Sequence, residues 1–152
     1  MKTRTLVTIF ILLLAVLVIA GSCATRRKTM VESESIRSIL TGTWINHEYD
    51  DVDFAAKTVA SDGSYDLFAE IDDTRRTYWG QYTISEAWID STGTYWYKAT
   101  FDESWTEVVY YELGKIDSTK SVWEWIYYSA GFPDEWEPEN SRYIYRIFYR
   151  QE

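Results

Sequence analysis

Apolar and polar residues alternate with a period of two along much of this 152-residue chain. Between Ser64 and Ile71 every second residue is apolar, and the same pattern recurs over residues 77–84 and 94–101. Successive side chains of a β-strand point to opposite faces of the sheet, so this period is typical of a strand with one buried face. The alternation therefore constrains the chain to a largely β structure.

Short turn signals separate these strands and predict antiparallel neighbours. Residues that favour tight turns, namely Gly, Asp, Ser and Thr, cluster at residues 61–64, 72–74, 91–93 and 117–120. Further strands are predicted over residues 42–49, 55–60, 106–116, 122–128 and 142–150. The total is about eight strands. Only residues 129–141, which contain both prolines of the chain, are expected to form a longer loop.

A chain of about eight short strands leaves two exposed sheet edges unless the sheet closes on itself. An antiparallel up-and-down barrel removes both edges, so we expect an all-β barrel of about eight strands. An open meander or a two-sheet sandwich remains the alternative, because periodicity alone does not distinguish these arrangements. Before the first strand, Val31 to Leu40 carries apolar residues at helical spacing and predicts a short helix.

Aromatic residues make up 18% of the chain, including eight Trp and thirteen Tyr. Aromatic side chains favour the half-buried surface of a sheet, and Trp and Tyr combine a flat apolar ring with one polar group. Such residues suit either a tightly packed core or a pocket for a small ligand. The composition thus supports the β prediction and leaves both kinds of interior open.

The N-terminus combines a short positive segment, a hydrophobic run and the single cysteine of the chain. Lys2 and Arg4 precede the run Leu6–Ala20, and Gly21-Ser22 leads directly to Cys23. This order resembles a bacterial lipoprotein signal with its lipobox, which implies cleavage before Cys23 and attachment of lipid to its thiol. An uncleaved membrane anchor and an ordinary signal peptide are the alternatives, although the run is short for a hydrocarbon core of about 30 Å.

This resemblance divides the chain into a signal peptide (1–22), a lipidated tether (23–30) and one barrel domain (31–152). It implies a location in the cell envelope, with the domain anchored to a membrane and facing the periplasm or the exterior. Removing residues 1–22 takes away two basic residues and no acid, so the net charge falls from −9 to −11. A body this acidic is a poor partner for nucleic acid. Its protein partner, if it has one, is not indicated by the sequence.

Gly42-Thr43-Trp44 follows the predicted helix and begins the first predicted strand. A Gly-x-Trp at this place resembles the lipocalin signature, and the whole layout is similar to bacterial lipocalin-like lipoproteins of the lipocalin and fatty-acid-binding barrel superfamily. In that family the Trp closes one end of the barrel and packs against an Arg of the last strand. The resemblance therefore implies that Trp44 seals the barrel, with Arg146 as its expected partner.

The sequence offers few candidate residues for catalysis or for metal binding. His47 is the only histidine, and it has no nucleophile at a recognisable spacing. The acids Glu48, Asp50, Asp51 and Asp53 lack the Gly and the terminal Glu of a calcium-binding loop, so they are expected to form a solvated turn. We therefore expect no enzyme activity, no metal site and no cofactor.

Two functions remain open. The first is non-covalent binding of a small apolar or amphipathic ligand inside the barrel. The residues that alternation predicts to line such a site are Tyr65, Leu67, Tyr82, Tyr97, Phe101, Tyr111, Trp123, Trp125 and Tyr145. The second is a solid-core interaction module that presents its outer aromatic side chains and the acidic loop around Trp136 to a protein or polysaccharide. Whether the interior is filled distinguishes the two.

Overall fold

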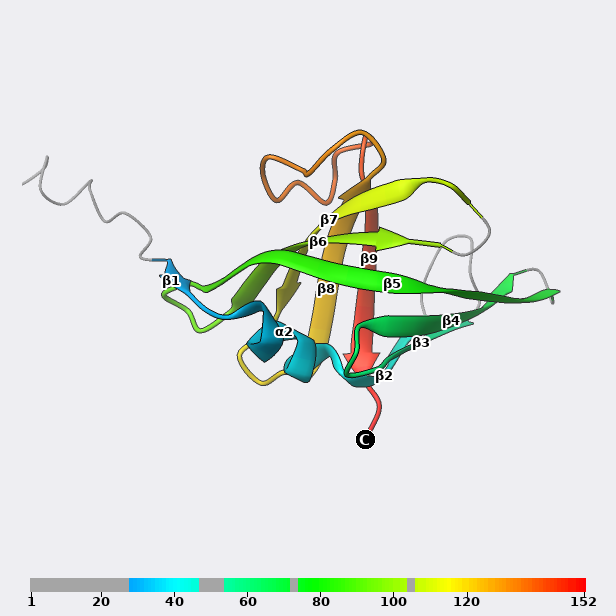
Figure 1. Cartoon of the computed structure of the whole chain (residues 1–152), viewed down its shortest axis with the longest axis horizontal. Coiled ribbons are helices and arrows are strands. Elements are labelled where there is room, and N and C mark those ends of the chain that lie inside the picture. Colours follow the sequence, from blue (N-terminus) through cyan, green and yellow to red (C-terminus); the bar gives the residue numbers. More distant parts are fainter. Residues whose placement is uncertain (1–27, 47–53, 72–73, 104–105) are drawn as a thin grey trace, which may run out of the picture.

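A computed structural model describes residues 28–46, 54–71, 74–103 and 106–152 (Figure 1). Within this part of the chain, strand β1 (Thr29–Met30) and helix α2 (Ser33–Leu40) precede eight longer strands. In chain order these are β2 (Gly42–Asn46), β3 (Phe54–Val59), β4 (Ser64–Ile71), β5 (Thr74–Ile89), β6 (Tyr95–Asp102), β7 (Val109–Ile116), β8 (Val122–Tyr128) and β9 (Ile144–Arg150). No helix of the described residues is long and apolar enough to cross a membrane.

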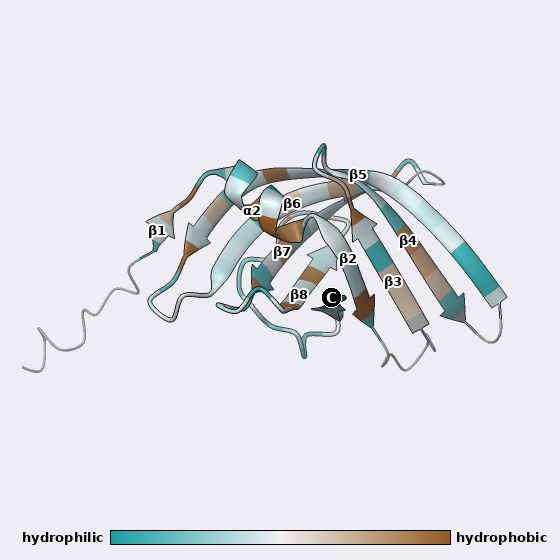
Figure 2. Cartoon of the chain, turned by 90° about the horizontal axis from the view of Figure 1, so that it is seen from below, coloured by the Kyte–Doolittle hydropathy of each residue, from teal (hydrophilic) through white to brown (hydrophobic). Residues whose placement is uncertain are grey.

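The eight strands β2 to β9 form a closed antiparallel barrel (Figures 1 and 2). Each strand pairs with the next along the chain, and β9 returns to pair with β2 through Trp44↔Arg150 and Ile45↔Tyr149. The predicted all-β up-and-down barrel is therefore confirmed, and the open meander and the sandwich are excluded. The seam between β2 and β9 is short, and a hydrogen bond from the Gln151 N–H to the Thr43 carbonyl extends it.

Strand β5 is twice as long as the alternation predicts. Its first half pairs with β4 and its second half with β6, with a register shift between Ile84 and Glu86. Such a bulge adds one residue to the strand and reverses which side chains face inward. Beyond it, Ala87 faces the core inside the barrel and Trp88 faces outward, where it joins a separate apolar cluster. The pattern therefore breaks at the bulge while the strand continues.

Helix α2 covers one end of the barrel (Figures 1 and 2). Its residues Ile36 and Leu40 are buried in the barrel core, which explains why apolar residues recur at helical spacing here. The helix ends at Leu40, and the N–H of the following residue, Thr41, donates to the Arg37 carbonyl. Gly42 follows with φ of 127°, a conformation that favours glycine and lets the chain turn into β2. The predicted helix is confirmed and starts two residues later than expected.

Aromatic and aliphatic side chains form two separate clusters, one inside the barrel and one on its outer face. The inner cluster gathers residues from α2 and from strands β2 to β9. The outer cluster is centred on Trp88, Leu113 and Ile126, and four aromatic residues pack against it, namely Trp96, Trp136, Tyr143 and Tyr145. Trp136 lies in the segment that the sequence predicts as a loop, and Tyr143 lies at the start of the last predicted strand, just before β9 as the structure has it. The fold therefore offers two aromatic environments as candidate sites.

Candidate functional site

Most of the residues predicted to face inward do so. Six of the nine belong to the buried core inside the barrel, and Leu67 packs against that core; the six are Tyr65, Tyr82, Tyr97, Phe101, Trp123 and Trp125. Their rings contact one another inside the barrel, for example Tyr65 and Tyr82 at 5.2 Å between ring centroids, and Trp123 and Trp125 at 4.3 Å. The structure thus brings these predicted residues together.

The inward orientation predicted for Tyr111 and Tyr145 is wrong. Tyr111 contacts Phe132 of the long loop on the outer face, with ring centroids 5.1 Å apart. Tyr145 belongs to the outer cluster, where its ring lies 6.2 Å from that of Trp136. The neighbouring Tyr110 packs against the core instead, because two adjacent tyrosines point to opposite faces of a strand.

The arginine that stacks on Trp44 is Arg150, which corrects the expectation of Arg146. The Arg150 guanidinium carbon lies 4.5 Å from the Trp44 ring centroid, and the Trp44 indole N–H donates to the Leu40 carbonyl at 2.8 Å. Arg150 also donates hydrogen bonds to the Lys120 and Ile39 carbonyls. The cation and the indole therefore tie the last strand to the end of the helix. Arg150 lies directly opposite Trp44 in the β2–β9 pairing, whereas Arg146 lies four residues earlier on β9.

A buried lysine and a buried glutamate, which the sequence analysis did not single out, lie at the centre of the barrel. Lys57 on β3 is 3% exposed and Glu112 on β7 is fully buried. Lys57 Nζ donates to the Tyr82 hydroxyl at 2.7 Å, and that hydroxyl donates to Glu112 Oε2 at 2.7 Å. Tyr97 donates to the other carboxylate oxygen and accepts from the Trp123 indole N–H at 2.6 Å. We call these five residues the interior network.

The ammonium group of Lys57 lies among aromatic rings. Its Nζ atom is 4.3 Å from the ring centroid of Tyr65 and 4.4 Å from that of Tyr82. The rings of Phe101, Trp123 and Trp125 lie at 5.0 to 5.3 Å. A cation within about 6 Å of a ring centroid is attracted by the ring, more strongly when both are desolvated. The ammonium group of Lys57 therefore occupies the place that these five aromatic rings surround.

Gly114 makes room for the ring of Tyr97. The two residues are direct partners in the β6–β7 pairing, and a Cβ atom on Gly114 would lie only 2.2 Å from Tyr97 Cζ. The ring therefore lies on the glycine backbone with its hydroxyl directed at Glu112, two residues earlier on β7. A missing side chain on one strand thus positions a hydrogen-bond donor for the carboxylate.

Burial shifts the pKa values of both charged residues in the direction that favours their neutral forms. It lowers the pKa of Lys57 to about 8, although the Glu112 and Glu103 carboxylates oppose this change. Burial likewise raises the pKa of Glu112 to about 6, against the effects of the Lys57 charge and of the hydrogen bonds from Tyr97 and Tyr82. Near pH 7 the interior therefore holds an ammonium and a carboxylate, bridged by a tyrosine hydroxyl.

The positions of Lys57 and Glu112 along their strands are a sequence signal for this pair. Lys57 lies between Ala55 and Val59 on the inward side of β3, and Glu112 lies between Tyr110 and Gly114 on the inward side of β7. A charged residue on an apolar face is expected to have a partner of opposite charge, because an unpaired buried charge is very costly. Reading each strand for charges on its apolar face would have found both residues.

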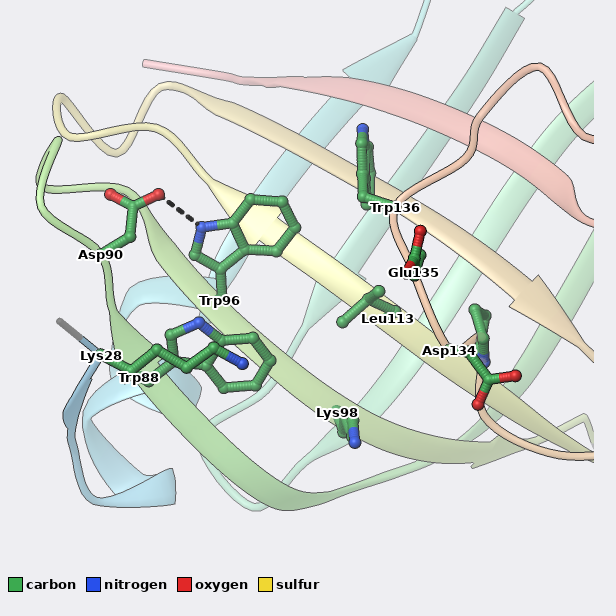
Figure 3. A pocket seen from close by; sticks show the side chains of 10 residues that line it. Lys28, Trp88, Asp90, Trp96, Lys98, Leu113, Asp134, Glu135 and Trp136 are labelled. Atoms are coloured by element: carbon green, nitrogen blue, oxygen red, sulfur yellow. Dashed lines mark hydrogen bonds between the residues drawn. The ribbon is translucent and has the colours of Figure 1, made fainter. Parts of the chain in front are cut away.

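The second candidate site is a pocket of about 480 Å³ on the outside of the barrel, which we call the outer pocket (Figure 3). Three tryptophans line it: Trp88 from β5, Trp96 from β6 and Trp136 from the long loop. Leu113 from β7 and Pro133 from the loop are also among the apolar lining residues. The pocket forms where residues 133–136 lie across the outer face of strands β5 to β7 (Figure 3).

The three indoles of the outer pocket have a defined arrangement. Trp88 and Trp96 are cross-strand partners whose rings are nearly parallel, with centroids 6.2 Å apart. Trp136 stands almost perpendicular to Trp96 at 5.4 Å. The Trp96 indole N–H donates to Asp90 Oδ2 at 2.9 Å, which fixes the ring (Figure 3). The perpendicular rings of Trp96 and Trp136, with Trp96 held by Asp90, form flat apolar surfaces that suit a small ligand of one well-defined shape.

Charged groups surround these rings. The lining includes the acids Asp90, Asp134 and Glu135 and the bases Lys28 and Lys98. Burial alone would raise the pKa of Asp90, but hydrogen bonds from Thr92, Trp96 and the turn backbone outweigh it and lower the pKa to about 2. Asp90 therefore carries a negative charge at any physiological pH.

Several predicted features lie outside the described residues. These are the lipid attachment site Cys23, the histidine His47 and the acidic turn at Glu48, Asp50, Asp51 and Asp53. Among the residues that are described, no group of three or more His, Cys, Asp and Glu side chains is arranged to hold a metal ion. Within the part of the chain that the structure describes, the candidate sites are the interior network and the outer pocket.

Comparisons of the chain with protein-family models, with curated proteins and with solved structures find no match. The resemblance to lipocalins thus stays a prediction, while the closed eight-stranded barrel is a finding. Function has to be inferred from the geometry of the two sites.

Proposed function

We propose that this protein is a binding module of the cell envelope, in which a filled barrel serves as scaffold and the outer pocket binds a small ligand or a projecting group of a larger partner. The observation that carries the proposal is the contrast between the two sites. Three tryptophans line a hollow of about 480 Å³ on the outer face, whereas the rings inside the barrel contact one another. This volume lies in the range of roughly 300 to 1,000 Å³ that is usual for small-molecule sites.

The interior network favours the solid-core function over the enclosed-ligand function. An apolar ligand inside the barrel would have to take the place of rings that surround Lys57. It would also separate Lys57 and Glu112 from the Tyr82 hydroxyl that bridges them. Leaving a buried charge without its partner costs several kcal/mol, roughly 3 to 5, which an apolar contact does not recover.

The proposed binding is non-covalent and needs no cofactor. Asp90, the acid that touches an indole of the pocket, is occupied by hydrogen bonds from Trp96 and from its own turn. Its oxygens therefore position the pocket wall and supply negative charge. The lipoprotein resemblance adds an anchor at Cys23, which would hold the module at a membrane surface.

The test measures which face of the barrel binds ligands. Calorimetric titrations use a panel of small sugars, organic ammonium salts and carboxylates, with a medium-chain fatty acid as the probe for the interior. Trp136→Ala removes one wall of the outer pocket. Trp79→Ala is the matched control, because Trp79 is 57% exposed on β5 and does not line the pocket.

At least one polar compound of the panel is expected to bind, with an affinity that falls about tenfold in Trp136→Ala and stays unchanged in Trp79→Ala. The fatty acid is expected to give no saturable binding. Saturable binding of the fatty acid that is unaffected by Trp136→Ala would overturn the proposal and favour the enclosed site.

A further inference from the structure

We propose that the outer pocket binds an organic ammonium group and that the Lys28 side chain is a built-in occupant of the same place, which the ligand displaces. This inference rests on the proposed function, because it names the class of ligand for that pocket. Its basis is a cation already seated on one of the three indoles, together with the charge of the remaining lining residues.

Lys28 Nζ lies 4.3 Å from the ring centroid of Trp88 (Figure 3). Trp88 is only 6% exposed, and its ring lies nearly parallel to that of Trp96. A cation this close to an indole is attracted by the electrons of the ring, and tryptophan is the most favourable aromatic partner. The pocket therefore already recognises an ammonium group, one that its own chain supplies.

The remaining charges of the pocket also favour a cation. Without Lys28, the lining keeps the three acids Asp90, Asp134 and Glu135 against the single base Lys98. Lys98 is itself paired with Glu86 at 3.4 Å, an acid outside the lining that offsets its charge. A positively charged group entering the pocket is thus attracted both by the rings and by the carboxylates.

Lys28 differs from the other lysine on these rings in how firmly it is held. Lys115 Nζ lies 4.6 Å from the Trp136 ring centroid, but it is also bound to Glu124 at 2.9 Å. Lys28 is exposed and has no ion-pair partner among the described residues. Lys28 can therefore leave the Trp88 ring without breaking a salt bridge, whereas Lys115 cannot leave Trp136 in that way.

The ligand's ammonium group has two sources with the same chemistry, a soluble amine or a lipid headgroup. Lys28 follows Cys23 by five residues, which limits their separation to roughly 18 Å. If Cys23 carries lipid, the pocket is thus held close to the headgroup layer. An ammonium-bearing headgroup then reaches the same indole as a free compound does.

The experiment uses the full chain in a non-ionic polyoxyethylene detergent and measures choline binding by calorimetry. The comparison compound is 3,3-dimethyl-1-butanol, which has the shape of choline without its charge, at equal ionic strength. Lys28→Gln removes the built-in cation. Lys120→Gln is the matched control, since Lys120 is also exposed and lies on a ring, 5.6 Å from Tyr95, away from the pocket.

Choline is expected to bind at least about tenfold more tightly than its neutral analogue. Lys28→Gln should tighten choline binding by about twofold to tenfold, because the site is no longer partly occupied, and Lys120→Gln should leave it unchanged. Equal binding of the two compounds, or no gain in Lys28→Gln, would overturn the inference. If a sugar or a carboxylate binds the pocket instead, the ligand class is wrong but the proposed function stands; if no compound binds, both fail.

Mixed micelles identify the source of the group. Phosphatidylethanolamine or phosphatidylglycerol is added to the detergent, and competition with choline is measured. Competition by the ammonium-bearing lipid alone supports a headgroup ligand, and competition by neither lipid supports a soluble one. Competition by phosphatidylglycerol alone would contradict recognition of an ammonium group.

Discussion

The strongest prediction concerns the buried pair Lys57 and Glu112. Glu112→Gln and Lys57→Met each neutralise one partner while keeping its approximate size. Two hydrogen bonds of 2.7 Å through the Tyr82 hydroxyl place Lys57 Nζ and Glu112 Oε2 no more than twice that distance apart. At an effective dielectric constant of about 20, the attraction between two unit charges at that separation is about 3 kcal/mol.

Each single substitution removes this attraction and leaves the other charge buried without its partner. The double substitution should cost about 3 kcal/mol less than the sum of the two single effects. Urea unfolding followed by tryptophan fluorescence measures all four free energies. Tyr82→Phe removes only the bridging hydroxyl, and its cost of about 1 to 3 kcal/mol gives a milder variant that keeps the fold.

The control is the exposed pair Arg75 and Glu70, which lies 3.8 Å apart with the arginine side chain 76% exposed. The same double-substitution experiment on that pair should give a coupling energy below about 1 kcal/mol. A coupling energy for Lys57 and Glu112 as small as that of the surface pair would refute the reasoning. It would mean that the two charges do not stabilise each other inside the barrel.

Three further predictions concern the pH response, the packing and the closure of the barrel. The pKa of Glu112 is raised from 4.5 to about 6, so its contribution to stability is complete below pH 4.5 and is lost as the pH rises through 6. The free energy of unfolding in urea should therefore be about 2 kcal/mol higher at the lower limit, and Glu112→Gln should abolish this difference. Lys57 has a lowered pKa of about 8, so stability should rise between pH 8 and 10.5, and a profile of Lys57→Met that keeps this rise would count against the assignment. Gly114→Ala should lower the unfolding free energy by about 1 to 3 kcal/mol, because the added methyl group collides with the ring packed on the glycine, and an unchanged urea midpoint would contradict that packing. Arg150→Ala should destabilise the barrel by about 1.5 to 3 kcal/mol more than Arg146→Ala in thermal unfolding, since Arg150 bonds the helix end, and equal losses would speak against this role in closure.

The strands and their closure could be predicted because each strand carries its own alternation and the turns between strands are short. Side-chain direction was predictable where apolar and polar residues alternate strictly, as for Tyr65 in β4. It was not predictable where aromatic residues are adjacent, as at Tyr110 and Tyr111, because both choices of face leave a tyrosine inside. The length of β5 was missed for a related reason, since its bulge reverses the pattern after Ile84.

The two candidate sites differ in how far the sequence determines them. The interior charges were readable in principle, because Lys57 and Glu112 interrupt apolar faces whose register the alternation fixes. The outer pocket was not readable, because it depends on where the loop carrying Trp136 lies against β5 to β7. No local pattern encodes that long-range contact, so the sequence alone leaves open whether Trp136 packs on the barrel rim or is offered to a partner. The pairing of Trp88 with Trp96 likewise depends on the register after the bulge.

The most direct test of a filled barrel with an outer binding face is a nuclear magnetic resonance titration of the chain with ¹⁵N-labelled tryptophan. The eight indole N–H groups give separate signals for the two sites. Trp88, Trp96 and Trp136 report on the outer pocket, and Trp44, Trp123 and Trp125 report on the barrel interior. With choline, the outer signals should shift in a saturable manner while the inner signals stay in place, and a fatty acid should shift neither set. Saturable shifts of the inner signals with the outer signals unchanged would contradict binding at the outer face and would favour a ligand site inside the barrel.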